Sequence, residues 1–260
     1  MTRWAAGVEY VGTAYSGWQW QLEAPSVQAA VERVLSNVAN HVVKLTAAGR
    51  TDAGVHAYNQ VVHFDSDAPR APIAWQFGGN SQLPRDISLR WVQFVGDDFH
   101  ARYGATARRY RYVMQSAAGR PALLDKRVAW VPGALAVEPM HRAAQALVGE
   151  HDFSAYRDSM CQSLSPVRRV HSITVRQHGE FAVLDIEANA FLHHMVRNIA
   201  GVLMAIGRGR QPEAWAATVL EGRVRAQGGV TAEPGGLYFV GPVYPERFGL
   251  PPAPRPWFPA

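Results

Sequence analysis

The order in which strand-like and helix-like segments follow one another most constrains what this chain can fold into. The first half runs strand, helix, strand, strand, helix, strand, at residues 4–11, 27–38, 42–47, 59–64, 73–77 and 87–95. The helix over 27–38 is the clearest of these, because apolar residues recur on one face at helical spacing and Ser26 is a good N-cap. This order is the split-βαβ pattern of ferredoxin-like folds.

The second half reuses the same α+β plan without a convincing repeat of residues. We expect strands at 108–114, 170–177, 182–188 and 237–243, and helices at 138–148, 191–206 and 212–220. Residues 121–133 read as a connector, and 151–167, which lack periodicity, as a long surface loop. We therefore predict an α+β fold of two fused ferredoxin-like subdomains sharing a mainly antiparallel sheet. Their predicted bounds are 1–104 and 105–246, followed by a proline-rich tail over 247–260.

Composition excludes several classes of protein. Hydrophobic residues at 48% and charged residues at 18% are typical of a globular, soluble chain. No apolar run reaches the roughly 18 residues of a membrane span, and the first residues lack a signal-peptide block. Cys161 is the single cysteine, so an internal disulfide or a thiolate zinc cluster is impossible. We expect a cytoplasmic protein with no membrane segment.

The charge balance points to a polyanionic partner. The net charge is +5 and the pI is about 9.6. Lys44 and Lys126 are the only lysines among the 26 basic residues. Arginine forks suit phosphate and RNA bases, but a GC-rich genome explains the same skew equally well. The inference therefore depends on the net charge and on where the arginines fall.

A glycine-bracketed segment, Gly49 to Gly54, lies between two predicted strands and carries Asp52 two residues after Arg50. Such an aspartate is more often a turn residue than a functional one. A neighbouring cation would keep Asp52 ionised, and an ionised carboxylate can act as nucleophile or general base. The sequence offers no obvious second carboxylate, which disfavours glycosidase chemistry, and no phosphate loop of the nucleoside-triphosphate type.

Histidines raise the question of a metal, and we predict none. His193 and His194 are adjacent, so on a helix their side chains would diverge instead of converging on an ion. His56, His193 and Asp52 could meet in space, but nothing in the sequence requires it. The alternative is that both histidines, with Arg197 at i+4 from His193, line the polar face of the helix over 191–206.

Tyrosines alternate with arginines on the strand over 108–114. For Tyr112 an ordinary cross-strand aromatic pair is the better interpretation. The functional alternative is a stacking surface for unstacked RNA bases beside basic side chains. Isolated arginines more often form a solvated face, but six could supply positive charge: Arg102, Arg108, Arg109, Arg111, Arg168 and Arg169. These residues predict a basic α+β protein with a candidate acidic site and do not select a reaction.

Seven segments resemble the tRNA pseudouridine synthases of the bacterial A type, in family order. The first is the signature Gly49-Arg50-Thr51-Asp52-Ala53-Gly54-Val55-His56-Ala57, and the others are residues 15–19, 99–102, 107–112, 149–153 and 191–198, with Gly236-Leu237-Tyr238 closing the series. The resemblance runs from Tyr10 to Tyr244, and implies the pseudouridine synthase fold. One departure lies at residues 232–236, where the family usually has an Ala-Pro-Ala-like approach to its Gly-Leu-Tyr.

The resemblance implies an isomerase that converts uridine to pseudouridine at positions 38, 39 and 40 of the tRNA anticodon stem-loop. Asp52 matches the family's essential aspartate. The reaction breaks the C1′–N1 bond and rejoins the uracil through C5, so it needs no redox or hydrolytic cofactor and no metal. A non-catalytic tRNA-binding protein or chaperone on the same scaffold is the main alternative, and a metal-dependent hydrolase using the histidines is the other.

Further roles are carried over from the family residue by residue. Arg50 matches an arginine that helps extrude the target base, and Tyr110 the tyrosine that stacks on it. Arg197 would hold Asp52 ionised, with Asp52 within its reach and beneath Tyr110, and Leu237 would pack against the site. Arg102, Arg108 and Arg168 are candidate RNA contacts. The family works as a homodimer, which doubles the charge of +5 to roughly +10 across a basic cleft for tRNA.

Overall fold

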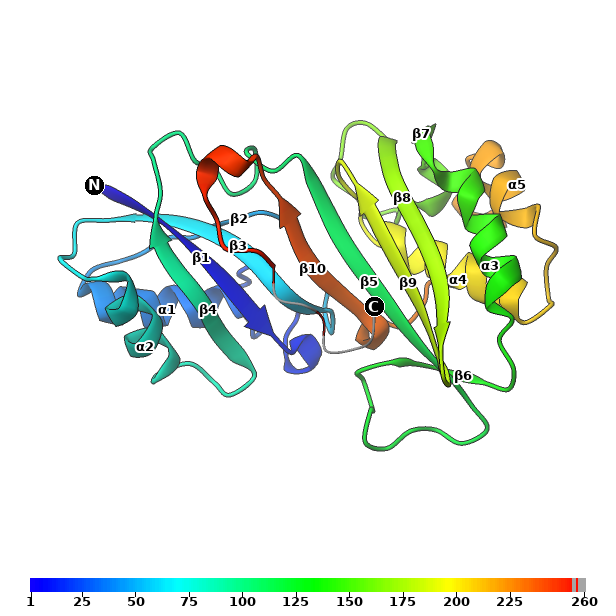
Figure 1. Ribbon diagram of the computed structural model, residues 1–260, viewed down its shortest axis with the longest axis horizontal. Coiled ribbons are helices and arrows are strands. Elements are labelled where there is room, and N and C mark those ends of the chain that lie inside the picture. The colour runs from blue at the N-terminus through cyan, green and yellow to red at the C-terminus, as the bar shows by residue number, and fades with distance from the viewer. Residues whose placement is uncertain (254–255, 257–260) are drawn as a thin grey trace. The chain divides into compact units, whose positions relative to one another are not determined.

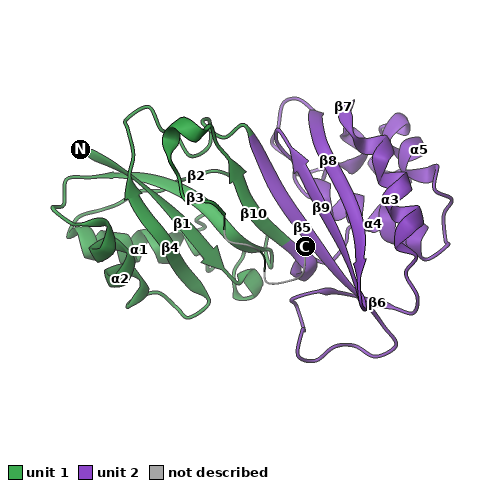
Figure 2. Cartoon of the chain, viewed as in Figure 1, with its two compact units in different colours: residues 1–106, 238–260 green, residues 107–237 purple. Residues whose placement is uncertain are grey.

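The computed structural model describes residues 1–253 and residue 256, and Figure 1 traces them. Contacts divide the chain into two compact units, coloured in Figure 2. Unit 1 comprises Met1–Thr106 and the described residues from Tyr238 onward, and unit 2 comprises Ala107–Leu237. The sequence placed 237–243 in the second subdomain, whereas its contacts group all but the first of these residues with unit 1.

The unit 1 strands are β1 (Thr2–Tyr10), β2 (Thr46–Ala47), β3 (His56–Ser66), β4 (Ile87–Phe94) and β10 (Leu237–Val243). They follow the order β4-β1-β3-β10, with β2 on β3. β1 pairs antiparallel with both β3 and β4, while β10 runs parallel to β3 with Tyr238 opposite His56. The final strand of the chain is thereby fixed beside the strand that leaves the Asp52 segment.

Two helices, α1 (Val27–Ala39) and α2 (Pro72–Asn80), cover one face of these strands (Figure 1). The apolar face predicted for α1 is buried, and the Ser26 hydroxyl accepts from the Ala29 N–H at 3.3 Å, which confirms the N-cap. α2 inserts Trp75 against Phe64 of β3, with ring centroids 5.1 Å apart. The helices are therefore held by apolar side chains on the sheet.

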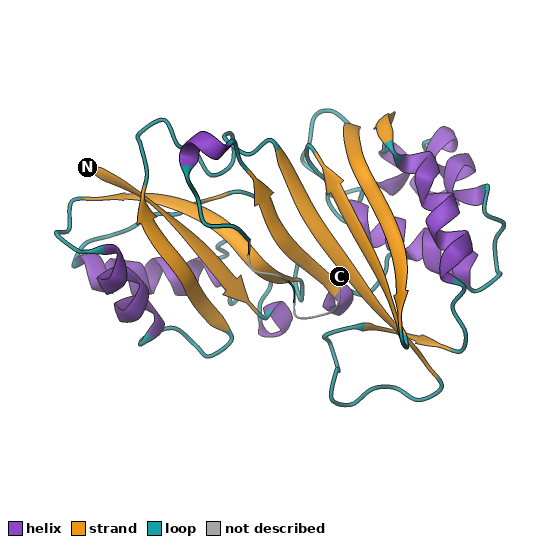
Figure 3. Ribbon diagram, in the orientation of Figure 1, coloured by secondary structure: helices purple, strands orange, loops and turns teal. Residues whose placement is uncertain are grey.

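The unit 2 strands are β5 (Ala107–Ala117), β6 (Ala129–Pro132), β7 (Gly149–Asp152), β8 (Val167–His178) and β9 (Phe181–Ala188). β5-β9-β8-β7 is antiparallel throughout, and β6 runs parallel to β5 after a long loop (Figure 3). The helices are α3 (Val137–Ala144), α4 (Met195–Gly207) and α5 (Trp215–Gly222). Both units combine helices with mainly antiparallel strand pairs, which confirms the α+β class. Over the described residues, no helix has the length and apolar character that crossing a bilayer requires.

Some local predictions were wrong. The strand predicted over 42–47 is reduced to Thr46–Ala47. The segment 151–167 is not simply a surface loop, since it contains the end of β7 and the fully buried Phe153 and Tyr156. Tyr156 donates its hydroxyl to the Ala216 carbonyl at 3.0 Å, so long-range contacts bury a stretch that has no periodicity of its own. The helix predicted from Phe191 begins only at Met195, because His194 has a left-handed backbone with φ of 60°.

Part of the predicted tail packs against unit 1 through Phe248 and Leu250. Phe248 lies against Phe99, with ring centroids 5.2 Å apart, and Tyr244 contacts the same ring. Leu250 adds to this cluster, which belongs to the core of unit 1. The rest of the predicted tail, residues 254–255 and 257–260, lies outside the described residues.

Candidate active site

Asp52 lies in a segment of residues 48–55 that connects β2 to β3 and is called here the Asp52 loop. A second stretch, the 12–18 segment, supports this loop through backbone hydrogen bonds. The Trp18 N–H donates to the Thr51 carbonyl at 3.0 Å, and the Gly54 N–H donates to the Tyr15 carbonyl at 3.3 Å. The backbone is thus held on both sides of Asp52 by one neighbouring segment.

Glycine is required where these two segments meet. Gly17 has φ of +97°, and a Cβ built on it would lie 2.6 Å from the Thr51 carbonyl oxygen, closer than Cβ atoms approach. Gly54 also has a positive φ, of +78°. Gly49, by contrast, has an ordinary φ, and its Cβ would meet nothing nearer than Phe239 at 3.9 Å. Of the two bracketing glycines, only Gly54 has a conformation that favours glycine.

Buried polar side chains also hold the Asp52 loop in place through hydrogen bonds. The Tyr10 and Thr51 hydroxyls lie 2.7 Å apart, and Gln60 donates to the Gly49 carbonyl at 2.6 Å. Burial raises the pKa of Tyr10 above its ordinary value, so its hydroxyl stays protonated. His56 accepts the Gly12 N–H on Nδ1 at 3.0 Å and packs on Tyr238, with ring centroids 4.8 Å apart. His56 thus acts in holding the backbone together.

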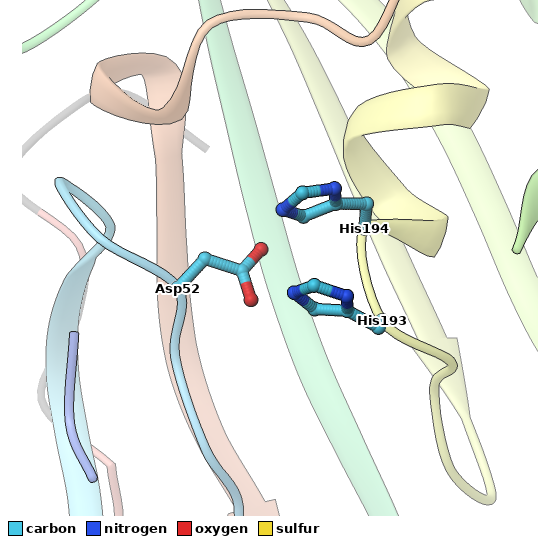
Figure 4. Close-up of side chains that lie close together, drawn as sticks. All are labelled: Asp52, His193 and His194. Carbon is cyan, nitrogen blue, oxygen red and sulfur yellow. The ribbon is translucent and has the colours of Figure 1, made fainter. Parts of the chain in front are cut away.

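Arg50 and Asp52, both predicted as site residues, lie on the Asp52 loop, whose backbone is held by these hydrogen bonds. Asp52 is half-buried and Arg50 is exposed. Figure 4 shows the Asp52 carboxylate projecting from its loop. A carboxylate on a backbone that is hydrogen-bonded on both sides is preorganised, which is what a nucleophile or general base requires.

In unit 2, Tyr110 lies on β5 and is 9% exposed, with its ring edge-on to Phe191 at 4.9 Å. Its arginine neighbours are neutralised across the sheet. Arg109 pairs with Glu187 at 2.6 Å, and Arg111 makes a two-pronged pair with Asp185 at 2.7 and 2.9 Å. The predicted basic face of this strand therefore carries little free positive charge.

Arg197 lies in the first turn of α4 and is fastened to the segment that precedes β10. Its Nε donates to the Ala232 carbonyl at 2.8 Å, and the Ala232 N–H donates back to the Arg197 carbonyl at 3.1 Å. Tyr112 is fully buried and donates its hydroxyl to the Glu233 carbonyl at 2.8 Å. Burial raises its pKa. Its partner on β9 is Leu184, so β9 does not supply the aromatic pair that was predicted for it. Leu237, the first residue of β10, is also buried.

The segment that departs from the family pattern is closely packed. A Cβ on Gly236 would lie 2.8 Å from the Val113 carbonyl oxygen, and one on Gly235 equally close to the Lys126 backbone. Both glycines are therefore required by close backbone approach in this chain.

His193 and His194 precede α4, so the prediction that they line its polar face was wrong. Their rings stack with centroids 4.0 Å apart (Figure 4), and both Nδ1 atoms lie near the Asp158 carboxylate, His194 at 2.8 Å and His193 at 3.4 Å. These donor types suit zinc, but two ligands of a tetrahedral zinc lie about 3.3 Å apart, so the shorter contact is a hydrogen bond. Burial acts to raise the pKa of Asp158, but the Met160 N–H and the histidines outweigh it and hold this pKa below its ordinary value. No pattern in the sequence singled out Asp158, which lies in the aperiodic segment 151–167.

The three candidate RNA-binding arginines differ in what they contact. Arg102 is exposed, with its guanidinium 5.6 Å from the centre of the Tyr103 ring. Arg108 is half-buried and donates to the Asn189 carbonyl at 3.0 Å. Arg168, the second residue of β8, turns back toward the preceding residues, donates to the Ser165 and Val167 carbonyls and to the Ser163 hydroxyl, and has a pKa lowered by burial. Arg168 therefore stabilises the start of β8 and the segment before it.

Comparison with known proteins finds similar sequences that cover nearly the whole chain. A family model described as tRNA pseudouridine synthase matches residues 6–104 and 143–245. The tRNA pseudouridine synthase A of Shewanella amazonensis is 56% identical over 249 residues, covering 96% of this chain and 95% of that protein. The protein of the same name from Nitrosococcus oceani is 54% identical over 254 residues, covering 98% of both.

Among solved structures, a chain of a Cbf5-Nop10-Gar1 complex is similar with a TM-score of 0.34 and 12% identity. The match covers 77% of this chain and 45% of that one. This likeness is too weak to carry an argument, so the sequence relatives provide the assignment.

Proposed function

Because this chain belongs to the tRNA pseudouridine synthase family, we propose that it isomerises uridine to pseudouridine at positions 38, 39 and 40 of the tRNA anticodon stem-loop. The observation that carries the proposal is identity above 50% to synthases of this name over nearly the whole chain. The pseudouridine synthase fold comes with that membership. The Asp52 loop, braced from both sides, supports a catalytic centre at this point of the chain.

Asp52 is the proposed catalytic group. The C1′–N1 bond of the target uridine breaks, the uracil turns, and a C1′–C5 bond forms while the C5 proton is lost and N1 gains one. Attack on C1′, addition at C6 and removal of the 2′ proton each need an ionised, well-placed carboxylate. The hydrogen bonds to Thr51 and Gly54 support that placement, because a fixed backbone needs little reorganisation during the reaction.

The target base must leave its stack before it can react, at a cost of a few kcal/mol. Arg50 is exposed on the same loop as Asp52, which supports its role in extruding the base and occupying the vacated space. We assign base stacking to Tyr110, ionic support of Asp52 to Arg197, and apolar packing to Leu237. Each of these three roles follows the family match of the residue.

tRNA is the proposed partner, bound through its anticodon stem-loop by a homodimer in the cytoplasm. Two chains of +5 each would present roughly +10 to one tRNA. Arg102, exposed, is the best supported of the candidate phosphate contacts, with Arg108 and Arg168 second. The reaction conserves all atoms of the substrate, so we propose no cofactor and no metal.

The test is Asp52→Asn, with Asp98→Asn as the matched control, since Asp98 is an exposed carboxylate of the same unit. We expect Asp52→Asn to abolish pseudouridine formation at unchanged tRNA affinity, and Asp98→Asn to change neither. Equal loss of affinity and activity in Asp52→Asn would make the residue structural. Mapping of pseudouridine in tRNA from cells that lack this protein completes the test. An unchanged map would favour the non-catalytic tRNA-binding alternative.

A further inference from the structure

Several exposed aromatic side chains lie outside the proposed catalytic roles, among them Trp20, Phe77, Phe94 and Tyr103, and Trp20 is the one in the loop next to the 12–18 segment. Trp20, in the loop between the 12–18 segment and α1, is 50% exposed. An indole is among the most apolar groups of a protein and usually contributes its surface to a core or an interface. Of its exposed neighbours, Gln19, Gln21 and Glu23 are polar and Leu22 is apolar, so Trp20 is the only aromatic side chain in a mostly polar stretch, residues 19–23.

The loop that carries Trp20 is ordered by its own hydrogen bonds. The Trp20 N–H donates to Oε1 of Gln28 in α1 at 3.1 Å, and Gln21 donates to the Ser16 carbonyl at 2.9 Å. The Ser16 N–H donates to the Pro25 carbonyl at 2.8 Å, which closes the loop at its base. The indole is therefore presented on a fixed backbone, and a ligand would not have to order that backbone on binding.

The same loop is tied directly to the Asp52 loop. Trp18, two residues before Trp20, is buried and donates its N–H to the Thr51 carbonyl at 3.0 Å. With about 3.8 Å between successive Cα atoms, the Trp20 backbone lies within about 12 Å of that carbonyl. Stacked nucleotides rise about 3.4 Å each, so this reach corresponds to three or four nucleotides of a strand.

We propose that Trp20 is a stacking platform for an unpaired base of the RNA substrate, a few nucleotides from the target uridine. This inference rests on the proposed function, because it takes Asp52 as the point where the target uridine binds. Unpaired bases stack on aromatic faces with little regard to sequence, and the exposed amide of Gln19 can hydrogen-bond a base edge. A protein partner is the less favoured occupant, since interface hot spots lie within an apolar patch, whereas Leu22 is the one other exposed apolar side chain in residues 19–23.

The test compares Trp20→Ala with Trp20→Phe and with Leu22→Ala, a control in the same loop whose side chain is 82% exposed but not aromatic. For the anticodon stem-loop, we expect Trp20→Ala to raise Kd and KM about 5- to 150-fold at unchanged kcat. Trp20→Phe should recover most of the affinity, and Leu22→Ala should bind as the unsubstituted protein does. Trp20→Ala with unaltered Kd would overturn the proposal.

A second measurement uses the unsubstituted protein and stem-loops in which each unpaired nucleotide is made abasic in turn. At one of these positions, removal of the base should weaken binding to the unsubstituted protein but leave binding to Trp20→Ala unchanged. This non-additivity is expected when the base and the Trp20 ring contact each other. No such position, or a change in sedimentation of Trp20→Ala in place of a change in RNA affinity, would assign Trp20 to a protein contact and refute stacking. Because these readouts measure binding, they remain decisive even if no pseudouridine forms, in which case the proposed function alone would fail.

Discussion

Gly17→Ala tests whether the 12–18 segment positions Asp52. The new Cβ would lie 2.6 Å from the Thr51 carbonyl oxygen, whereas Cβ contacts below 3.0 Å are essentially never seen. The two backbones must therefore separate by several tenths of an ångström at the residue that precedes Asp52. Alanine would also have to adopt φ of +97°, which L-residues rarely do.

The size of the effect follows from these two terms. Backbone strain in a sparsely populated region costs about 1–3 kcal/mol, and loss of the Trp18–Thr51 hydrogen bond costs about 1 kcal/mol. The free energy of unfolding should therefore fall by about 2–4 kcal/mol. A misplacement of about 1 Å can cost 100-fold in rate, so this smaller shift at Asp52 should lower kcat about tenfold.

Gly179→Ala is the matched control, because Gly179 has φ of +60° and a Cβ there meets nothing within 4 Å. It should lower stability by about 1–2 kcal/mol and leave kcat unchanged. Gly49→Ala should change neither quantity appreciably. Denaturant unfolding and single-turnover pseudouridine formation measure the two effects. If Gly17→Ala loses stability but keeps its rate, as Gly179→Ala does, the positioning role is refuted.

Three further outcomes are expected. Tyr110→Phe should leave tRNA affinity nearly unchanged because the stacking ring remains, and a large loss of affinity in a filter-binding assay would contradict base stacking. Affinity for tRNA should fall steeply as salt rises, since phosphate contacts release counterions; a flat salt titration would contradict a basic binding surface. Burial first, and then His100 and Arg3, lower the pKa of His63 to about 4, so the fold favours its neutral form. The resulting stability is fully present above pH 6.5 and is lost as the pH falls from 6.5 to 4. The free energy of unfolding, measured across this range, should therefore depend less on pH in His63→Gln than in the unsubstituted protein. An identical pH dependence would exclude His63 as its source.

Much of the fold could be predicted because local pattern and local chemistry agreed. In α1 the helical spacing of apolar residues coincided with a cap at Ser26, and both are observed. The segment 151–167 could not be predicted, because Phe153 and Tyr156 are buried by residues far along the chain. The parallel pairing of β10 with β3 is likewise a long-range feature that no pattern in either strand specifies.

The candidate site was predictable to a similar extent. Arg50 and Asp52 were singled out because they lie two residues apart in a glycine-bracketed segment between two predicted strands. The resemblance of this segment to the family signature supplied their roles. The supports of the loop were not predictable, since the contacts of Thr51 with Tyr10 and Trp18 join positions more than 30 residues apart. Of the 12–18 segment, only residues from 15 on were singled out in the sequence, as part of one segment that resembles the family. The function of the 12–18 segment follows from the geometry at Gly17.

Pairing across the unit 2 sheet changes where positive charge is available to RNA. The register of β5 with β9 sets Arg109 opposite Glu187 and Arg111 opposite Asp185. Arginines that alternate with tyrosines on one strand therefore face carboxylates that alternate with apolar residues on the next. An ion pair already made must be broken before its arginine can hold a phosphate at full strength. A net charge of +5 consequently underdetermines the binding surface, because the arginines of the strand that first suggested RNA binding already face carboxylates.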